Sequence, residues 1–306
     1  MWKEFLCKIK RVTALKRKIS AISRNLDEIK MMQGRLWSAN LKTADIRCLQ
    51  EAEFKVYSQW GDDGIIQYLL SILEIKNKVF IEFGVEDYEE ANTRFLLKNN
   101  NWRGLIIDGV KENISKIVAR DEFWRYDLTA KAAFVTRENI NALILDSGFS
   151  GDIGLLHIDI DGNDYWVWKA IDVVAPVIVI IEYNSVFGSE KLVTVPYDPA
   201  FLRSKAHHSF LFWGASLPAL CDLAQEKGYV FIGSNSNGNN AYFIRKDCFR
   251  DSALKALTAQ EGYVCSCFRE SRNERGDLNY LAGDARLKAV RGCLVFNIKT
   301  STLEVL

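Results

Sequence analysis

The sequence predicts an α/β protein built on a doubly wound sheet, with a long helix in front of it. Segments typical of strands and of helices alternate from about residue 55 to residue 230, which indicates a parallel sheet flanked by helices. One of these segments, residues 176–183, is almost continuously apolar, as expected of a strand that is buried on both faces. The 306 residues, 48% of them hydrophobic, suffice for one such domain and an appendage.

The first 40 residues predict one basic, amphipathic helix. Its apolar residues follow alternating steps of three and four from Val12 onward, and Gln33 is the one polar residue in that register. We expect a coiled coil that forms a homo-oligomer, with weak peripheral contact of its basic end with anionic lipid. The alternative is a helix that packs on its own domain. The seam residues are Phe5, Val12, Leu15, Ile19, Ile22, Leu26, Ile29 and Leu36.

The remaining elements are placed by apolar periodicity and by turn residues. The expected helices are 62–73, 91–99, 111–119, 137–147, 165–171 and 217–227. The expected strands are 78–83, 104–108, 132–136, 154–160, 176–183, 229–233 and 241–245. The last two strands are joined by a polar turn, so five strand–helix units end in an antiparallel hairpin at the edge of the sheet.

The chain divides into three parts. Residues 1–40 form the helix, residues 41–250 the α/β domain, and residues 251–306 an extension that contains a strand-like segment at 294–298 whose role stays open.

Composition excludes several classes of protein. The net charge is +1, and the basic residues concentrate in the N-terminal helix, so we expect no nucleic-acid partner. Seven cysteines form no CxxC pair, which fits free thiols in a reducing cytoplasm. No apolar run reaches the length of about 18 residues needed to span a membrane, and no signal peptide begins the sequence. We therefore expect a cytoplasmic protein.

The most informative stretch is residues 155–166, Leu-Leu-His-Ile-Asp-Ile-Asp-Gly-Asn-Asp-Tyr-Trp. Its apolar half is typical of a buried strand, and its carboxylates mark the strand's end. Ligands of open α/β sheets bind at the carboxyl ends of strands, so we expect Asp159, Asp161, Asn163 and Asp164 to face a ligand. A calcium loop is excluded, because the glycine and the final carboxylate have the wrong spacing.

Two further strand ends predict a nucleotide-type site. Gly84 follows the first strand, and in Rossmann units a glycine at this turn lets the backbone approach the ligand. The helix beyond it offers free N–H groups to an anionic group. Asp108 ends the second strand, where a carboxylate accepts both hydroxyls of a ribose. The alternative is that these are ordinary strand-end residues.

Four ordered motifs resemble the FkbM-type branch of S-adenosylmethionine-dependent methyltransferases. They are Tyr-Ser-Gln-Trp-Gly-Asp-Asp-Gly at 57–64, Phe-Ile-Glu-Phe-Gly at 80–84, Trp-Arg-Gly-Leu-Ile-Ile-Asp at 102–108 and Leu-His-Ile-Asp-Ile-Asp-Gly at 156–162. The resemblance covers about residues 55–245 and implies a Rossmann-like, class I methyltransferase fold and O-methylation of a sugar or glycan intermediate. It places Glu82 and Gly84 in the cofactor loop, Asp108 on the ribose and Asp159 between cofactor and acceptor.

The sequence departs from this family in the cofactor loop. Glu86 and Tyr88 stand where the family has further glycines, and Glu86 adds negative charge near the expected methionine carboxylate. Gln59, with Tyr57, Trp60 and Asp62, is expected to close over the cofactor. The alternative function is a non-methylating protein on the same fold that binds a nucleotide or sugar nucleotide, or that serves as a scaffold.

Methyl transfer to oxygen needs positioning and a base for the hydroxyl proton. Of the three histidines, His207 and His208 follow the fifth strand on the acceptor side, and one of them is the expected base; the alternative is an ordinary loop histidine. His157 lies within a strand and is expected in the core. The expected acceptor-binding residues are Asp161, Asn163, Glu182, Tyr183, Asn184, Arg203 and Asn239, with Tyr197, Trp213, Asn235, Asn237 and Asn240 around them.

A magnesium ion is the alternative role for the acidic strand ends. Asp159, Asp161 and Glu182, with Asn184, offer the oxygen ligands that Mg²⁺ prefers, and such an ion could hold an acceptor's hydroxyls. The competing interpretation is that Asp161 and Asn163 cap the helix that follows them.

Overall fold

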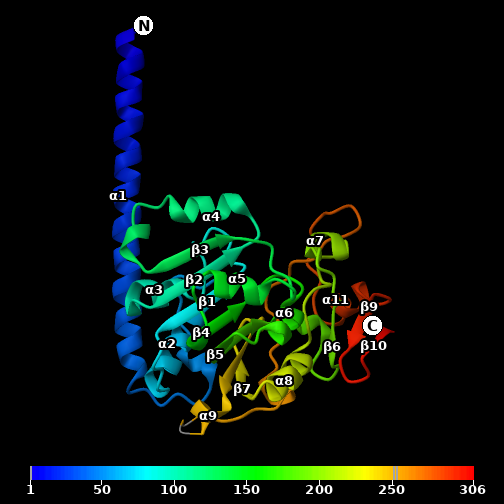
Figure 1. Cartoon of the computed structure of the whole chain (residues 1–306). Helices are drawn as coiled ribbons and strands as arrows, with labels where there is room; N and C mark the ends of the chain where they lie inside the picture. The colour runs from blue at the N-terminus through cyan, green and yellow to red at the C-terminus, as the bar shows by residue number, and fades with distance from the viewer. Residues whose placement is uncertain (1, 251, 253) are drawn as a thin grey trace.

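The computed structural model describes residues 2–250, 252 and 254–306, with the backbone alone for residues 3–12, 16 and 20 (Figure 1). Helix α1 (Trp2–Leu41) runs along one side of the body and projects well beyond it, which confirms the N-terminal helix. Two of the predicted seam residues, Phe5 and Val12, lie outside the described side chains. No helix in the described part of the chain is long and apolar enough to cross a membrane.

The body contains a seven-stranded sheet in the order β3-β2-β1-β4-β5-β8-β7. Strands β1 to β5 are parallel, whereas β8 is antiparallel to both of its neighbours. This arrangement confirms the doubly wound sheet with a hairpin edge. The strands are β1 (Val79–Phe83), β2 (Arg103–Asp108), β3 (Leu128–Ala132), β4 (Gly151–Ile158), β5 (Val174–Glu182), β7 (Tyr229–Ser234) and β8 (Asn240–Arg245).

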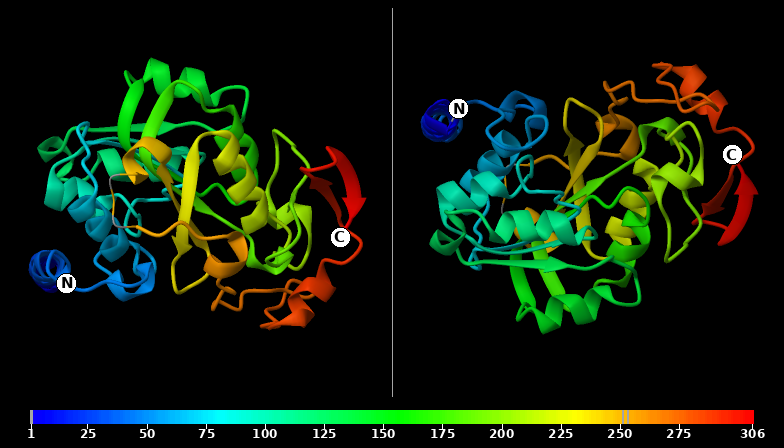
Figure 2. Two further views of the ribbon diagram at one scale, coloured as in Figure 1. Left: turned by 90° about the horizontal axis from the view of Figure 1, so that it is seen from below. Right: turned by 90° about the horizontal axis from the view of Figure 1, so that it is seen from above.

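Helices cover both faces of the sheet, which produces the three layers visible in Figure 2. Alternate residues of each strand enter different cores: Phe80 packs with α2, α3 and α4, while Ile81 packs with α5, α6 and α8. Burial on both faces is the reason why these strands are continuously apolar. The helices are α2 (Asp62–Ile72), α3 (Arg94–Asn100), α4 (Lys111–Val118), α5 (Ile140–Asp146), α6 (Asp164–Ala170) and α8 (Leu217–Glu226).

The prediction of the third strand at 132–136 was wrong. The strand is β3 (Leu128–Ala132), and it pairs with Gly104–Asp108 at the edge of the sheet. An edge strand is only partly covered, so it needs no unbroken apolar run, and its sequence Leu-Thr-Ala-Lys-Ala has none. The apolar letters that suggested a strand lie in the following loop, where Phe134 is largely exposed. Strand β4 likewise begins and ends earlier than predicted, at Gly151 and Ile158.

The C-terminal extension folds together with the segment between β5 and α8. Strand β9 (Leu294–Asn297), within the predicted 294–298 segment, lies between β10 (Thr302–Val305) and β6 (Val193–Thr194) in a second, three-stranded sheet. A small core that includes Val193, Leu211 and Val295 holds them together. The remaining short elements are η1 (Leu49–Ala52), η2 (Phe123–Arg125), η3 (Ser185–Phe187), α7 (Arg203–Ala206), α9 (Lys246–Phe249), α10 (Ala259–Gly262) and α11 (Asp284–Ala289).

Candidate functional site

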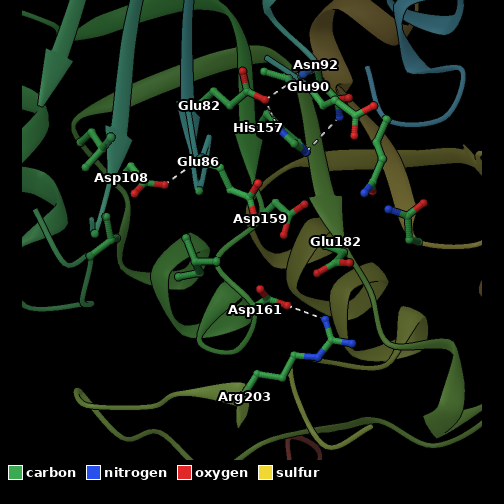
Figure 3. A pocket seen from close by; sticks show the side chains of 18 of the residues that line it. Glu82, Glu86, Glu90, Asn92, Asp108, His157, Asp159, Asp161, Glu182 and Arg203 are labelled. Atoms are coloured by element: carbon green, nitrogen blue, oxygen red, sulfur yellow. Dashed lines mark hydrogen bonds and ion pairs between the residues drawn. The ribbon is translucent and has the colours of Figure 1, made fainter. Parts of the chain in front are cut away.

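A cavity of about 500 Å³ lies at the carboxyl ends of β1, β2, β4 and β5 (Figure 3). The chain order of the strands reverses between β1 and β4, and this switch point is where open α/β sheets bind ligands. Among the predicted residues, the lining includes Gln59, Trp60, Asp62, Glu82, Gly84, Glu86, Asp108, His157, Asp159, Asp161, Asn163, Glu182, Arg203, Asn239 and Asn240. The strand ends therefore meet at one site, as the sequence predicts.

Gly84 brings the ends of β1 and β4 into direct contact. Its φ is +74°, and a Cβ at this position would lie 1.6 Å from the carbonyl oxygen of Asp159. Its N–H donates to the carbonyl of Ile107 on β2 at 3.0 Å. Only glycine fits this backbone conformation and this contact without displacing a neighbouring strand.

The loop after Gly84 keeps a glycine-like backbone without glycines. Glu86 (φ 48°) and Tyr88 (φ 63°) both occupy the left-handed region that glycine favours. The buried Tyr88 hydroxyl bonds to Thr93 Oγ1 at 2.9 Å, which fixes the loop on the start of α3. The departure from the family pattern therefore changes the side chains of the loop, while its backbone still turns where glycines are expected.

Asp108 sits at the end of β2 with its carboxylate on the cavity. Its Oδ2 accepts the backbone N–H of Glu86 at 2.8 Å, and its Oδ1 accepts the N–H of Val110 at 2.8 Å. Asn113 Nδ2 donates to Oδ1 as well, at 3.3 Å, so about one of the four acceptor positions of a carboxylate is left for a ligand. The cavity-facing, anchored carboxylate is suited to a ribose hydroxyl.

Glu82 and His157 form a buried pair within the cavity lining. His157 Nδ1 lies 2.8 Å from Glu82 Oε1, and Asn92 Nδ2 lies 3.1 Å from His157 Nε2 (Figure 3). Burial alone lowers the pKa of His157, but the hydrogen bond and charge of Glu82 outweigh it and raise that pKa. Glu82 also accepts the backbone N–H groups of Asn92 and Thr93 at 2.9 and 3.1 Å. Its role is therefore to anchor the start of α3 against β1.

Asp159 and Glu182 form a second acidic pair, on the acceptor side. Burial first, and then the charge of Asp161, raise the pKa of Asp159 to about 6. Burial and the charge of Asp159 raise the pKa of Glu182 well above its usual value. Two adjacent carboxyls cannot both ionise easily, so the pair keeps one proton. Glu182 Oε2 is buried and has no hydrogen-bond partner among the described residues.

Arg203, from α7, closes the far side of the cavity but is already neutralised. Its Nη1 lies 2.7 Å from Asp161 Oδ1, and its Nη2 lies 3.6 Å from Glu270 Oε2. The guanidinium also stacks 4.9 Å from the ring centroid of Trp213. Because both of its charge partners line the cavity with it, Arg203 brings no net positive charge to the site.

Asn163 occupies the N-cap position of α6, as the capping interpretation expects, but its side chain forms no capping hydrogen bond, and Asp161 does not cap the helix. Asp161 pairs with Arg203, and Asn163 donates its Nδ2 to the carbonyl of Asp198 at 2.7 Å. The buried Asp164 carboxylate instead accepts the N–H groups of Ile160 and Gly162, both at 2.9 Å, and so shapes the turn before α6.

The acidic residues also do not fit a magnesium site. Asp161 is already paired with Arg203, whose Nη1 lies 2.7 Å from its Oδ1. In the described ranges, no group of three or more His, Cys, Asp or Glu side chains has the arrangement needed to hold a metal ion. We therefore assign no metal-dependent step to these residues.

Several predicted residues serve the scaffold rather than the cavity. His207 and His208 are absent from the lining, and His207 Nδ1 bonds to Ser209 Oγ at 2.8 Å. The Tyr183 hydroxyl donates to the carbonyl of Val264 at 2.6 Å, and Asn184 donates to the carbonyls of Leu211 and Trp213, both at 2.9 Å. Tyr57, Asn235, Asn237, Tyr197 and Trp213 likewise lie outside the lining.

The hairpin asparagines hold the start of α2 in place. Asp62 accepts Asn240 Nδ2 at 2.9 Å and Asn235 Nδ2 at 3.2 Å, and it also bonds to the Tyr242 hydroxyl. This network brings the 57–64 segment beside the β7–β8 turn, so that Gln59 and Trp60 reach the cavity. Sequence reasoning missed Glu90, Phe134, Phe201 and Glu270, which line the cavity from loops whose course no local pattern signals.

Comparison with known proteins finds similarity only at the level of structure. No protein-family model matches the sequence, and no curated protein matches it. Among the solved structures that resemble it, the DszA carbon methyltransferase is 11% identical with a TM-score of 0.39, over 60% of this chain and 52% of that one. The CurJ carbon methyltransferase is 10% identical with a TM-score of 0.40, over 65% and 57% respectively. An O-methyltransferase from Bacillus cereus in complex with SAH is 13% identical with a TM-score of 0.35, over 55% and 72%.

The names of these structures describe carbon methyltransferases, O-methyltransferases and S-adenosylmethionine-dependent methyltransferases. Similarity this low assigns no activity to this chain. The chain spans only a little over half the length of the two carbon methyltransferases. The fold is assigned from the strand order itself. The likeness to FkbM-type methyltransferases remains a resemblance of sequence motifs.

The contact at Gly84 predicts that replacement by alanine lowers stability much more at Gly84 than at Gly109, another glycine of the same cavity. Gly84→Ala forces a Cβ against the Asp159 carbonyl, so we expect a loss of about 2–4 kcal/mol in the free energy of unfolding. Gly109→Ala is the control, because its Cβ would meet only Phe134 Cδ2 at 3.4 Å. Urea denaturation of both variants measures the difference. Equal stability of the two variants would contradict the role given to Gly84.

Proposed function

We propose that this chain is an S-adenosylmethionine-dependent O-methyltransferase that acts on an uncharged, polyhydroxylated acceptor such as a sugar or glycan intermediate. The observation that carries the proposal is the acidic lining of a cavity at the switch point of the sheet. S-adenosylmethionine has a sulfonium and an ammonium group, which a negative cavity attracts. The carboxylates of the lining are Asp62, Glu82, Glu86, Glu90, Asp108, Asp159, Asp161, Glu182 and Glu270.

The same charge distribution argues against the alternative of a sugar-nucleotide site. A diphosphate needs Arg, Lys or several free N–H groups. The cationic groups of the lining are Arg203, which is paired with Asp161 and Glu270, and His157, which is paired with Glu82. Each cation of the described lining therefore already has a carboxylate partner, which disfavours a diphosphate or another anionic ligand, although the buried Nη2 of Arg203 has no hydrogen-bond partner among the described residues.

The cofactor site combines Gly84, Asp108 and the acidic loop. Asp108 would hold the ribose, and Gly84 would let the rest of the cofactor lie close to the backbone. The exposed Glu86 carboxylate is then a partner for the ammonium group rather than for the carboxylate of the methionine moiety. Bound there, the cofactor supplies an electrophilic methyl group on its sulfonium sulfur.

The Asp159–Glu182 pair replaces the histidines as the proposed base. With the cofactor bound, the acceptor oxygen would take its methyl group as the carbon–sulfur bond breaks, with S-adenosylhomocysteine as the second product. The hydroxyl proton passes to the ionised member of the pair, which lies within the cavity. The amides of Asn239 and Asn240 and of Gln59 are suited to hold the other hydroxyls of the acceptor.

Isothermal titration tests the cofactor proposal directly. We expect heat with S-adenosylmethionine and with S-adenosylhomocysteine, and none with uridine diphosphate glucose, which the acidic lining repels. Asp108→Asn removes the charge and two acceptor positions, so binding should weaken about tenfold, which is about 1.4 kcal/mol. The control Asp87→Asn removes one carboxylate charge from the loop after β1, at a residue outside the lining, and should bind normally. Heat with the sugar nucleotide alone would refute the proposal.

The raised pKa of Asp159 predicts the pH dependence of the reaction. The base acts when ionised, so kcat should rise with pH and level off above about 6, the pKa of Asp159. We expect Asp159→Asn to lower kcat by about 10²–10⁴-fold. The double variant His207→Ala, His208→Ala should keep the wild-type profile. Release of S-adenosylhomocysteine with a panel of neutral glycosides gives the rate, and an unchanged profile in Asp159→Asn would contradict the assignment.

A further inference from the structure

The apolar seam of α1 is open on the described surface. Every one of its described members is more than half exposed, from 51% for Ile29 to 65% for Leu36. Met32 and Trp37, which flank the seam, are 62% and 58% exposed. Exposed apolar side chains in a continuous row mark a surface that another molecule covers. The described seam consists of Leu15, Ile19, Ile22, Leu26, Ile29 and Leu36.

The protein's own domain covers a different face of the same helix. Asp27 forms an ion pair with Lys98 at 2.7 Å, Met31 is buried beside Val56, and a Cβ on Gly34 would lie 2.6 Å from Val56. This face and the seam point in different directions: Met31 and Leu26 are five residues apart and therefore about 140° apart around the helix. Packing on the body thus leaves the seam uncovered.

The N-terminal half of α1 also lacks support from the body. The N-terminal half of the helix extends far past the other elements in Figure 1. Every described side chain before Ala21 is exposed. A helix of this kind gains most of its stability from packing of an amphipathic face, so this half requires a partner.

The spacing of the seam indicates a helix as that partner. Steps of three and four produce a narrow stripe that supercoils against an equal stripe, whereas a helix lying in a lipid interface needs a broader apolar face. We propose that the seam binds the same seam of further copies of this chain, in a parallel and in-register coiled coil. In this arrangement each Gln33 meets the Gln33 of the partner copy, so the one polar layer satisfies itself; an antiparallel pairing would bury it against apolar residues.

The charges beside the seam give the coiled coil a distinctive response to salt. In the heptad register of the sequence, positions 11 and 16 pair across a parallel coiled coil; both are basic, and like charges at such positions repel. The next layers pair Lys18 with Ser23, Asn25 with Lys30 and Met32 with Trp37, which adds no further repulsion between equal charges. Salt screens the Arg11–Lys16 repulsion, so self-association should tighten as ionic strength rises. Binding to anionic lipid would weaken instead.

Light scattering tests this inference by measuring the particle mass of the full chain at salt concentrations from about 50 mM to about 500 mM. We expect two or more copies per particle, increasing with salt. The double variant Ile22→Lys, Leu26→Lys should be monomeric. The control Ala14→Lys, Ala21→Lys adds the same charge on another face of the helix and should keep the wild-type mass. None of these residues belongs to the cavity, so cofactor titration and thermal unfolding of the body report correct folding independently.

Disulfide cross-linking tests whether the paired α1 helices are parallel. Leu36→Cys lies in the seam, and only a parallel, in-register pair brings two such residues together; Arg24→Cys lies outside the seam and is the control. We expect a covalent dimer for Leu36→Cys under oxidation, above the wild-type background from native cysteines. A monomeric wild-type chain, or sedimentation with phosphatidylserine vesicles in place of self-association, would overturn the inference, and so would cross-linking of Arg24→Cys alone.

Discussion

The contact between Gly84 and the carbonyl of Asp159 sets the geometry on which the candidate site depends. It joins the ends of β1 and β4, the two strands between which the chain order reverses. Any larger residue at position 84 would separate those ends, and the carboxylates that follow them would no longer face one cavity. The loop beyond Gly84 then turns through two left-handed residues, and the N–H of one of them, Glu86, reaches Asp108.

Around this contact, buried acids take two different roles because their neighbours differ. Glu82 faces His157 and the N–H groups at the start of α3, and these partners lower its pKa against the opposing effect of burial. Asp159 and Glu182 face each other and Asp161, and lack such partners, so burial and repulsion raise the pKa of both. The first carboxylate is a structural anchor, whereas the second pair is able to exchange a proton near neutral pH. The neighbours of each buried acid therefore decide whether it supports the fold, as Glu82 does, or is proposed to take part in the reaction, as Asp159 and Glu182 are.

Sequence alone predicted the residues of the site that directly follow an apolar strand. Gly84, Asp108 and Asp159 each follow an apolar strand, and parallel strands bring their carboxyl ends together, so their meeting could be foreseen. His207, His208 and Tyr183 could not be placed in this way. Tyr183 is the first residue after β5, but its ring turns into the core toward Val264, and the histidine loop follows contacts of the C-terminal extension. Edge strand β3 was misplaced because a half-covered strand has little apolar pattern.

The proposed function requires that the acidic cavity hold S-adenosylmethionine with its reactive sulfur beside Asp159 and Glu182. The most direct measurement is a crystal structure of the full chain grown with S-adenosylhomocysteine. We expect ribose hydroxyls within hydrogen-bonding distance of the Asp108 carboxylate, the adenosyl sulfur facing the Asp159–Glu182 pair, and the ammonium group near Glu86. Density for the ligand at another place on the protein, or an adenosyl group turned so that its sulfur points away from Asp159, would contradict it.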